Sequence, residues 1–288
     1  MCSQVFNSFT TNIKTPYYFS NSIASIPVAK HEAQTQASTT DKNVVNEKTL
    51  GVAALLQSIA IAIQKGSQWL ARKLEAGKEF TSFENVKRIV SNMVSEHKLG
   101  NVTIDYISDA NKAKYTGSQL AKEIEVVAQG KNAFYADALK LAVAPKSKPS
   151  LILHELGHAS NSKNFFMQIL QKSRKYAMAA PMALLALSKF VGRKDENKPN
   201  FIERNAGILG FSAFLPTIIE EGMASLKGIK AISKTPKELL KGAVNSGILK
   251  RNYLLALGTY VLAGIGLGVA SKQAILENST LNNRLTKN

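Results

Sequence analysis

Two histidines stand four residues apart in the run His154-Glu155-Leu156-Gly157-His158. On an α-helix this spacing places both imidazoles on one face, where two neutral rings can bind a single Zn²⁺. Glu155 lies next to the first histidine and can take a proton from a water whose pKa the metal lowers. The pattern therefore predicts a hydrolytic zinc site, with His154 and His158 as metal ligands and Glu155 as the general base.

The residues around this run favour the helix that such chemistry needs. Pro149 and Ser150 precede an apolar stretch of Leu-Ile-Leu at 151–153, a pattern typical of a helix start. Gly157 would cost about 0.5–1 kcal/mol relative to alanine inside a helix, so we expect a close approach of backbone or substrate there. The alternative is a chance pair of histidines on a buried helix.

A third protein ligand is expected for zinc, and the acidic pair Glu220-Glu221 is the strongest candidate. Two adjacent carboxylates directly after an apolar segment are costly unless they are solvated or paired, and a bound cation would remove that cost. The alternative is a solvated acidic end close to Lys227 and Lys230.

The order of these groups resembles the gluzincin metallopeptidases, whose third ligand is a glutamate on a helix downstream of the histidine pair. It is loosely similar to the HtpX-like and CAAX-prenyl-protease membrane peptidases, in which the ligand glutamate has Ala three residues on and Asp four on. Glu221 has Ala224 and Ser225 at those positions, so the resemblance implies Glu221 as the ligand, with Glu220 as the alternative. Ser225 would orient a histidine ligand more weakly than the family's aspartate.

The elements that position the motif begin after residues 1–48, which are polar and predict a disordered tail. Residues 49–98 predict two N-terminal helices, the first over 49–75 and the second over 82–98. Ser82 is the expected N-cap of the second helix. Its apolar stripe has helical spacing: Phe83, Val86, Ile89, Val90, Met93 and Val94.

Residues 99–175 combine a small mixed sheet with the helix of the histidine motif. The alternation of Val102, Ile104 and Tyr106 with polar residues predicts a half-buried strand. Further strands are expected over 124–128, 134–135 and 139–143. An edge strand of this sheet could bind an extended substrate.

Residues 176–271 contain three apolar stretches, over 176–191, 206–219 and 253–270. Only the last approaches the length of about 20 residues that spans a bilayer. It contains Gly264 and Gly268, a spacing that lets helices approach closely in lipid. Residues 272–288 predict a polar C-terminal tail. The alternative to membrane helices is a set of buried helices in a soluble domain.

The charge of the chain favours a lipid partner. The net charge is +17, and most of the excess lies in the more apolar second half, as expected at an anionic membrane surface. Residues 222–251 contain seven Lys or Arg against Glu238 alone, which by the positive-inside rule places the catalytic site on the cytoplasmic side. No zinc finger and no basic helix with interleaved aromatics is found, so no nucleic acid is expected.

Together these patterns predict a mainly α (α+β) protein, with a zincin-like active-site helix, a small sheet and two or three apolar membrane helices. The predicted function is a membrane-associated zinc metalloendopeptidase acting on peptide or protein substrates. The alternative is a non-enzymatic membrane protein in which the histidine helix is incidental or binds metal structurally. A site-2-type intramembrane protease is disfavoured because the apolar stretches lack the aspartate ligand that it requires.

Overall fold

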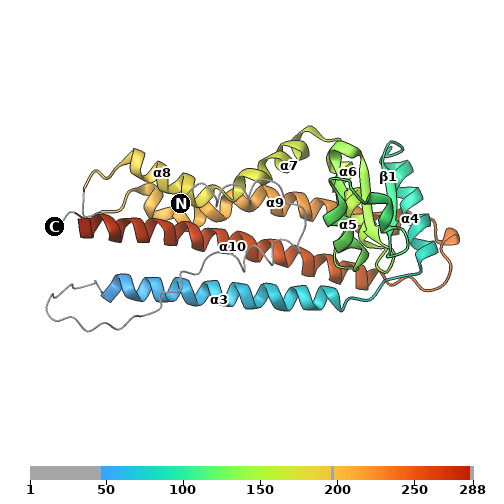
Figure 1. Cartoon of the computed structure of the whole chain (residues 1–288), viewed down its shortest axis with the longest axis horizontal. Coiled ribbons are helices and arrows are strands. Elements are labelled where there is room, and N and C mark those ends of the chain that lie inside the picture. The colour runs from blue at the N-terminus through green and yellow to red at the C-terminus, as the bar shows by residue number, and fades with distance from the viewer. Residues whose placement is uncertain (1–46, 196–197, 286–288) are drawn as a thin grey trace. The chain divides into compact units, whose positions relative to one another are not determined.

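Helices make up most of the chain in the computed structural model, which describes residues 47–195 and 198–285, and they accompany one small sheet (Figure 1). The elements in chain order are α3 (Glu47–Glu75), α4 (Phe83–Glu96), β1 (Thr103–Ile107), α5 (Ala121–Ala128), β2 (Phe134–Ala136), β3 (Leu141–Pro145), α6 (Leu151–Asn161), α7 (Phe165–Ala177), α8 (Ala180–Val191), α9 (Phe201–Lys234) and α10 (Ser246–Leu285). The prediction of a mainly helical fold with a small mixed sheet is confirmed. Residues 1–46 of the expected polar tail lie outside the described residues.

The sheet has three strands in the order β1-β3-β2. The central strand β3 pairs in parallel with β1 and antiparallel with β2. All five β3 residues are buried, because Ala142 and Ala144 pack into a core with α4 and α6, while Leu141 and Val143 pack into a second core with α5. The predicted strands around residues 104, 134 and 141 are therefore confirmed.

The predicted strand over residues 124–128 is wrong, because this segment lies in the helix α5. Its two fully buried residues, Ile124 and Val127, are three apart, which is the spacing of a helix face and not of a strand. Residues of high β-propensity in a short run suggested a strand, but packing against the sheet selected the helix.

The chain divides into two compact units, which we call the sheet unit and the helical unit. Within the described residues, the sheet unit comprises 69–175 and 216–261, and the helical unit comprises 47–68, 176–215 and 262–285. Helices α3, α9 and α10 each contribute residues to both units. All the predicted metal ligands and Glu155 belong to the sheet unit.

The core of the sheet unit forms around α4 and α6. As predicted, Ser82 caps α4 by accepting a hydrogen bond from the backbone N–H of Asn85 at 3.3 Å. The buried stripe of α4 packs with the buried face of α6 and with residues of α9 and α10. Because all these elements share one core, α6 is held rigidly between α4 and the two long helices.

In the helical unit, α9 and α10 approach closely at small residues. A Cβ added at Gly268 would lie 2.6 Å from the carbonyl oxygen of Gly207, and one added at Gly210 would lie 2.2 Å from Oγ of Ser271. A Cβ added at Gly264 would lie 3.2 Å from ring carbons of both Phe211 and Phe214 of α9. The Gly264 and Gly268 pair thus lies in a helix–helix contact, as its spacing predicts.

The apolar stretches differ from the prediction in their boundaries. Residues 176–191 are divided between the end of α7 and α8, and residues 206–219 lie inside the 34-residue α9. Among the described residues, Ser246–Asn278 of α10 is the one segment long and apolar enough to cross a membrane, by length and composition. The polar residues expected to form a C-terminal tail continue α10 as far as Leu285.

Candidate metal centre

The histidine motif lies on α6, as its flanking residues predict. Ile152, Leu153, Leu156 and Ala159 are the apolar residues of this helix that enter the core of the sheet unit. His154 and His158 occupy the opposite face, one turn apart, with their ring centroids 4.6 Å from each other. The packing of the apolar face therefore fixes the direction in which both imidazoles point.

Helix α9 approaches α6 at Gly157 more closely than any side chain would permit. A Cβ at Gly157 would lie 2.3 Å from the carbonyl oxygen of Ala224, and 2.7 Å from the Cα of that residue. One turn away on α9, a Cβ at Gly228 would lie 3.2 Å from the carbonyl oxygen of Leu153. The predicted backbone approach at Gly157 is thus found, and its partner is α9, the helix that carries the acidic pair.

Three ligand atoms converge where the two helices meet. Nε2 of His154 lies 3.0 Å from Nε2 of His158 and 3.1 Å from Oε2 of Glu221, and the remaining distance, from Nε2 of His158 to Oε2 of Glu221, is 3.6 Å. Ligands at 2.0–2.1 Å from a tetrahedral ion are separated from one another by about 3.3 Å. These three residues could therefore hold a metal ion without rearrangement.

The other ring nitrogens of the histidines have partners that turn Nε2 toward this point. Nδ1 of His158 lies 2.8 Å from Oε1 of Glu220, and because a carboxylate can only accept, Nδ1–H donates, which leaves the lone pair of the neutral ring on Nε2. Nδ1 of His154 lies 3.1 Å from Oγ of Ser225, which can accept in the same way. Partners of this kind fix the tautomer and orientation of a metal-binding histidine.

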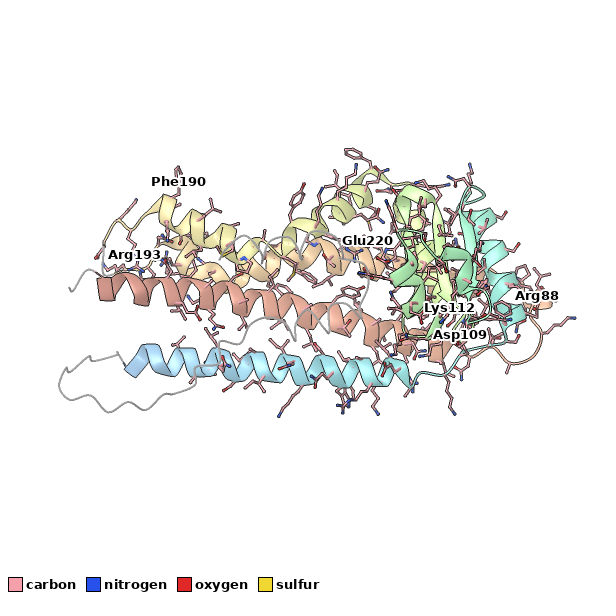
Figure 2. All side chains as sticks on the ribbon, in the orientation of Figure 1. Arg88, Asp109, Lys112, Phe190, Arg193 and Glu220 are labelled. Atoms are coloured by element: carbon pink, nitrogen blue, oxygen red, sulfur yellow. The ribbon has the colours of Figure 1, made fainter. Side chains whose placement is uncertain are left out.

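Glu220 and Glu221 thus have different positions, although the sequence left either one as a possible ligand. Figure 2 marks Glu220 on α9. Its Oε1 accepts hydrogen bonds from Asn161 at 3.0 Å and from Gln171 at 2.8 Å, in addition to His158. Glu221 alone of the pair directs an oxygen at both histidine Nε2 atoms.

The alternative of a solvated acidic end is wrong. Glu220 and Glu221 are 0% and 2% exposed, because α9 continues past them as a helix for more than three further turns. The cation that accompanies them is Arg174 of α7, whose Nη1 lies 2.9 Å from Oε2 of Glu220 and whose Nη2 lies 2.5 Å from Oε1 of Glu221.

Sequence reasoning missed Arg174, Gln171 and Asn161. One signal could have indicated the first of these. Met167, Leu170 and Ala177 are the buried apolar residues of α7, and Arg174 lies among them at the spacing of the same helix face. A charged residue on the buried face of an amphipathic helix requires a partner, and the acidic pair Glu220-Glu221 in the same half of the chain was one candidate.

The electrostatics of the cluster follow from its burial and its pairing. For Glu220, burial alone would raise the pKa, but the charges of His158 and Arg174 outweigh it and lower the pKa to about 2. For Glu221, burial is likewise outweighed, here by Arg174 and His158, so its pKa falls well below the usual value. Burial would lower the pKa of His158, yet the two carboxylates raise it well above 6.5. In the metal-free protein, a protonated His158 therefore compensates part of the negative charge of the two carboxylates.

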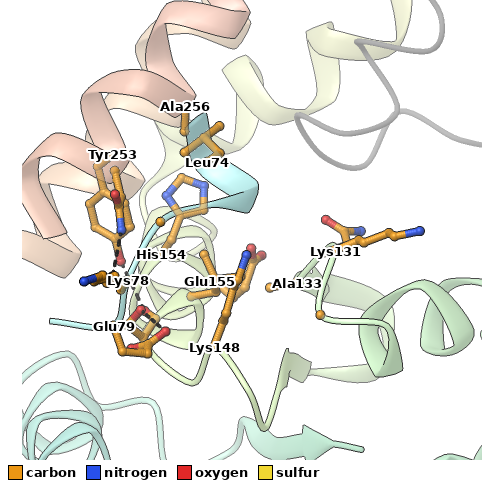
Figure 3. A pocket seen from close by; sticks show the side chains of 16 residues that line it. Leu74, Lys78, Glu79, Lys131, Ala133, Lys148, His154, Glu155, Tyr253 and Ala256 are labelled. Carbon is orange, nitrogen blue, oxygen red and sulfur yellow. Dashed lines mark hydrogen bonds between the residues drawn. The ribbon is translucent and has the colours of Figure 1, made fainter. Parts of the chain in front are cut away.

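Glu155 lines a pocket together with His154, as Figure 3 shows from close by. Burial raises the pKa of Glu155, and the nearby histidines counteract this only in part. The lining comes from several elements of the sheet unit: Leu74, Gly77, Lys78, Glu79, Gly130, Lys131, Asn132, Ala133, Lys148, Ser150, Leu151, His154, Glu155, Asn252, Tyr253 and Ala256. A metal ion held by His154 could thus be reached from this pocket, whereas Glu220 and Arg174 are not among the lining residues.

The pocket also adjoins an edge of the sheet. Residues 130–133 line it and lead directly into β2, which is an edge strand because β3 is central. Tyr253 of α10 forms part of the wall, with its ring centroid 5.6 Å from that of His154 and its hydroxyl donating to the carbonyl oxygen of Ser150 at 3.3 Å.

No family model, no curated protein and no solved structure matches this chain.

Proposed function

We propose that this protein is a zinc-dependent metallopeptidase attached to a membrane. The observation that carries the proposal is the convergence of the three ligand atoms of His154, His158 and Glu221 within 3.6 Å of one another. These atoms come from two helices whose contact requires a glycine, so the convergence depends on the tertiary fold and not only on a local sequence pattern. A third ligand from a downstream helix is also what the resemblance to gluzincins implies.

Charge favours a divalent cation at this point. Three carboxylates, on Glu155, Glu220 and Glu221, are buried at the site, and Arg174 is paired with the last two of them. With both histidines neutral, the cluster has two negative charges in excess. Buried charges are tolerated when they are paired or coordinate a metal, and one divalent ion restores neutrality. Two imidazoles with one carboxylate form a ligand set typical of catalytic zinc.

An open coordination position separates the catalytic interpretation from the structural one. Structural zinc sites are usually closed by four protein ligands, whereas catalytic sites use three and leave the fourth position to water or substrate. Here three protein groups converge, and His154 and Glu155 line a pocket. This arrangement supports an enzyme over the alternative of a purely structural site.

Zinc bound here would supply a Lewis acid for the peptide carbonyl and would lower the pKa of a bound water. The chain's own contribution is the carboxylate of Glu155, which lines the pocket and would accept a proton from such a water. Because burial raises the pKa of Glu155, its basicity lies closer to that needed for proton transfer near neutral pH. The carboxylic acid so formed can then return the proton to the leaving amine.

The substrate that fits this site is an extended peptide. Strand β2 is an edge strand, and the segment that precedes it lines the pocket. An extended segment can add to such an edge through main-chain hydrogen bonds, which favour peptides without requiring one particular sequence.

Membrane attachment is proposed from α10 together with the charge. Residues 246–278 have the length and composition of a span, and the chain has a net charge of +17. Five of the seven basic residues between 222 and 251 precede this helix, and Lys250 and Arg251 lie in its first two turns. By the positive-inside rule we assign them, and the metal site with them, to the cytoplasmic side.

The decisive experiment is zinc analysis of the purified full-length protein after loosely bound metal is removed. We expect one zinc per chain in the wild type, loss in His154→Ala, and weaker retention in Glu221→Gln than in Glu220→Gln. Glu155→Gln should retain the zinc but lose peptide hydrolysis by about 100- to 10,000-fold, the usual contribution of a general base. A wild-type protein without zinc would overturn the proposal. A zinc protein whose activity survives Glu155→Gln would overturn the role of Glu155.

A further inference from the structure

We propose that Arg174 is a positioning residue that makes Glu221 bind the metal through one oxygen only, and that the same guanidinium holds Glu220 against His158. The inference rests on the proposed function, because it concerns the same metal site. It assigns a role to α7, a helix that contributes no metal ligand.

The guanidinium divides its two terminal nitrogens between the two carboxylates. Nη1 contacts Oε2 of Glu220 at 2.9 Å, and Nη2 contacts Oε1 of Glu221 at 2.5 Å. The second oxygen of each carboxylate is the one that faces a histidine: Oε2 of Glu221 lies 3.1 Å from Nε2 of His154, and Oε1 of Glu220 lies 2.8 Å from Nδ1 of His158. Each carboxylate therefore connects Arg174 to one histidine: Glu221 to His154, and Glu220 to His158.

The contact between Arg174 and Oε1 of Glu221 limits how Glu221 can bind a metal ion. A glutamate with both oxygens free can bind a metal ion through both, which would occupy the position that water and substrate need at a catalytic ion. A charged hydrogen bond to Oε1 of Glu221 opposes that second metal bond. Arg174 would thus keep the coordination number of a bound ion low.

Through Glu220, Arg174 also restrains the ring of His158. Glu220 fixes the ring by accepting from Nδ1–H, and Glu220 is itself fixed by Arg174 and by Gln171, both on α7. Partners of this kind commonly change metal affinity by about 10- to 100-fold when they are removed. One side chain therefore restrains two of the three ligands.

Burial makes a lysine a poor substitute. The Arg174 side chain is 13% exposed, and the two carboxylates are 0% and 2% exposed. A planar guanidinium can point separate N–H groups at two carboxylates, whereas an ammonium is a compact charge that cannot hold both in fixed directions. We therefore expect Arg174→Lys to preserve the fold and part of the affinity but not the geometry at the metal.

The test is the absorption spectrum of the full-length protein with Co²⁺ in place of zinc, because four-coordinate Co²⁺ absorbs more strongly in the visible range than five-coordinate Co²⁺. The wild type should show the intense four-coordinate spectrum. Arg174→Met and Arg174→Lys should show a weaker, five-coordinate spectrum and a zinc affinity lowered by about 10- to 100-fold. Gln171→Met should lower affinity less and keep the wild-type spectrum, because it removes a contact to Glu220 but none to Glu221.

Arg193→Met is the matched control, since Arg193 pairs with Glu203 in the helical unit and not with a residue of the metal centre. Should Arg174→Met fail to fold, Arg174→Lys decides by the same spectrum. A folded Arg174 variant with the wild-type cobalt spectrum and zinc affinity would overturn the inference and leave the peptidase proposal standing. A wild type that binds neither Co²⁺ nor zinc would instead overturn the proposed function itself.

Discussion

The two units of this protein each contain a close contact between helices that only glycine permits. In the helical unit, Gly207 and Gly268 let α9 and α10 approach, and the nearest groups are small or apolar. In the sheet unit, Gly157 lets α6 and α9 approach, and the groups brought together are His154, His158, Glu220 and Glu221. A close contact at glycine thus stabilises the helix pair in one unit, and in the other it brings together charged groups and the candidate metal ligands.

The contact in the sheet unit requires compensation of buried charge as well as complementary shape. Apolar surfaces that approach closely gain contacts with no electrostatic cost. Two buried carboxylates on neighbouring residues are held together only if cations accompany them. Arg174 supplies one such cation in the protein itself. The remaining negative charge is the physical reason to expect a metal ion in the sheet unit and none in the contact between Gly207 and Gly268.

Breaking the contact in the sheet unit should have the largest effect. In Gly157→Ala, the new methyl group would lie 2.3 Å from a backbone oxygen of α9, which cannot turn aside as a flexible side chain would. We expect Glu221 to move away from the histidines, with loss of stoichiometric zinc and of activity. Overpacking should also lower stability by about 1–3 kcal/mol. Zinc analysis and thermal unfolding measure the two effects, and unchanged zinc content would show that α6 and α9 need not touch at this point.

The charged cluster should make the metal-free protein sensitive to acid. Because the pKa of Glu220 is lowered to about 2 in the folded state, its carboxylate contributes stability that is present above about pH 4.5 and is lost as the pH falls toward 2. The contribution is on the order of 3 kcal/mol for a shift of this size. Unfolding by urea at pH 6, 4 and 3 in the presence of a chelator measures it.

Glu220→Gln tests the origin of this acid sensitivity. An uncharged amide at that position should flatten the dependence of stability on pH between about 4.5 and 2. Equal pH dependence in the variant and the wild type would place the sensitivity elsewhere in the molecule.

The sequence predicted those parts of the site that depend on neighbours in the chain. The helix around His154, the cap at Ser82 and the need for a close approach at Gly157 all follow from local spacing and composition. The identity of that approaching helix does not, since Ala224 lies far along the chain from Gly157. For the same reason, the sequence left Glu220 and Glu221 as alternatives, and their different positions became clear only from the directions of their oxygens.

Two failures of the sequence prediction have physical causes. Residues 124–128 are too few for periodicity to distinguish a strand from a helix, and the packing of Ile124 and Val127 onto the sheet decided the outcome. The acidic pair was assigned to the end of an apolar helix because hydropathy falls there. The helix in fact continues, because Arg174 and the histidines compensate charges that solvent would otherwise have to reach.

The contact in the helical unit should affect stability alone. In Gly268→Ala, the added methyl group would lie 2.6 Å from the carbonyl oxygen of Gly207, so we expect a loss of about 1–3 kcal/mol from overpacking. Zinc content and the cobalt spectrum should match the wild type, because the proposed ligands His154, His158 and Glu221 all lie in the sheet unit. A change in the metal site would mean that the two contacts are energetically coupled, and the comparison between the units would then fail.

Gly222→Ala should have the smallest effect, with the opposite sign. Gly222 lies inside α9 directly after Glu221, yet a Cβ there would come no closer than 3.8 Å to a side-chain carbon of Leu257, an ordinary contact. Alanine has a higher helix propensity than glycine, so we expect a gain of about 0.5–1 kcal/mol with zinc content unchanged. Gly222 is nearer in sequence to the proposed third ligand than Gly157 is. Comparing the two variants therefore tells whether zinc binding depends on closeness to Glu221 in the sequence or on the contact between α6 and α9. If Gly222→Ala also abolished zinc binding, the site would be sensitive to any change beside Glu221, and the loss in Gly157→Ala could not be assigned to the contact between α6 and α9.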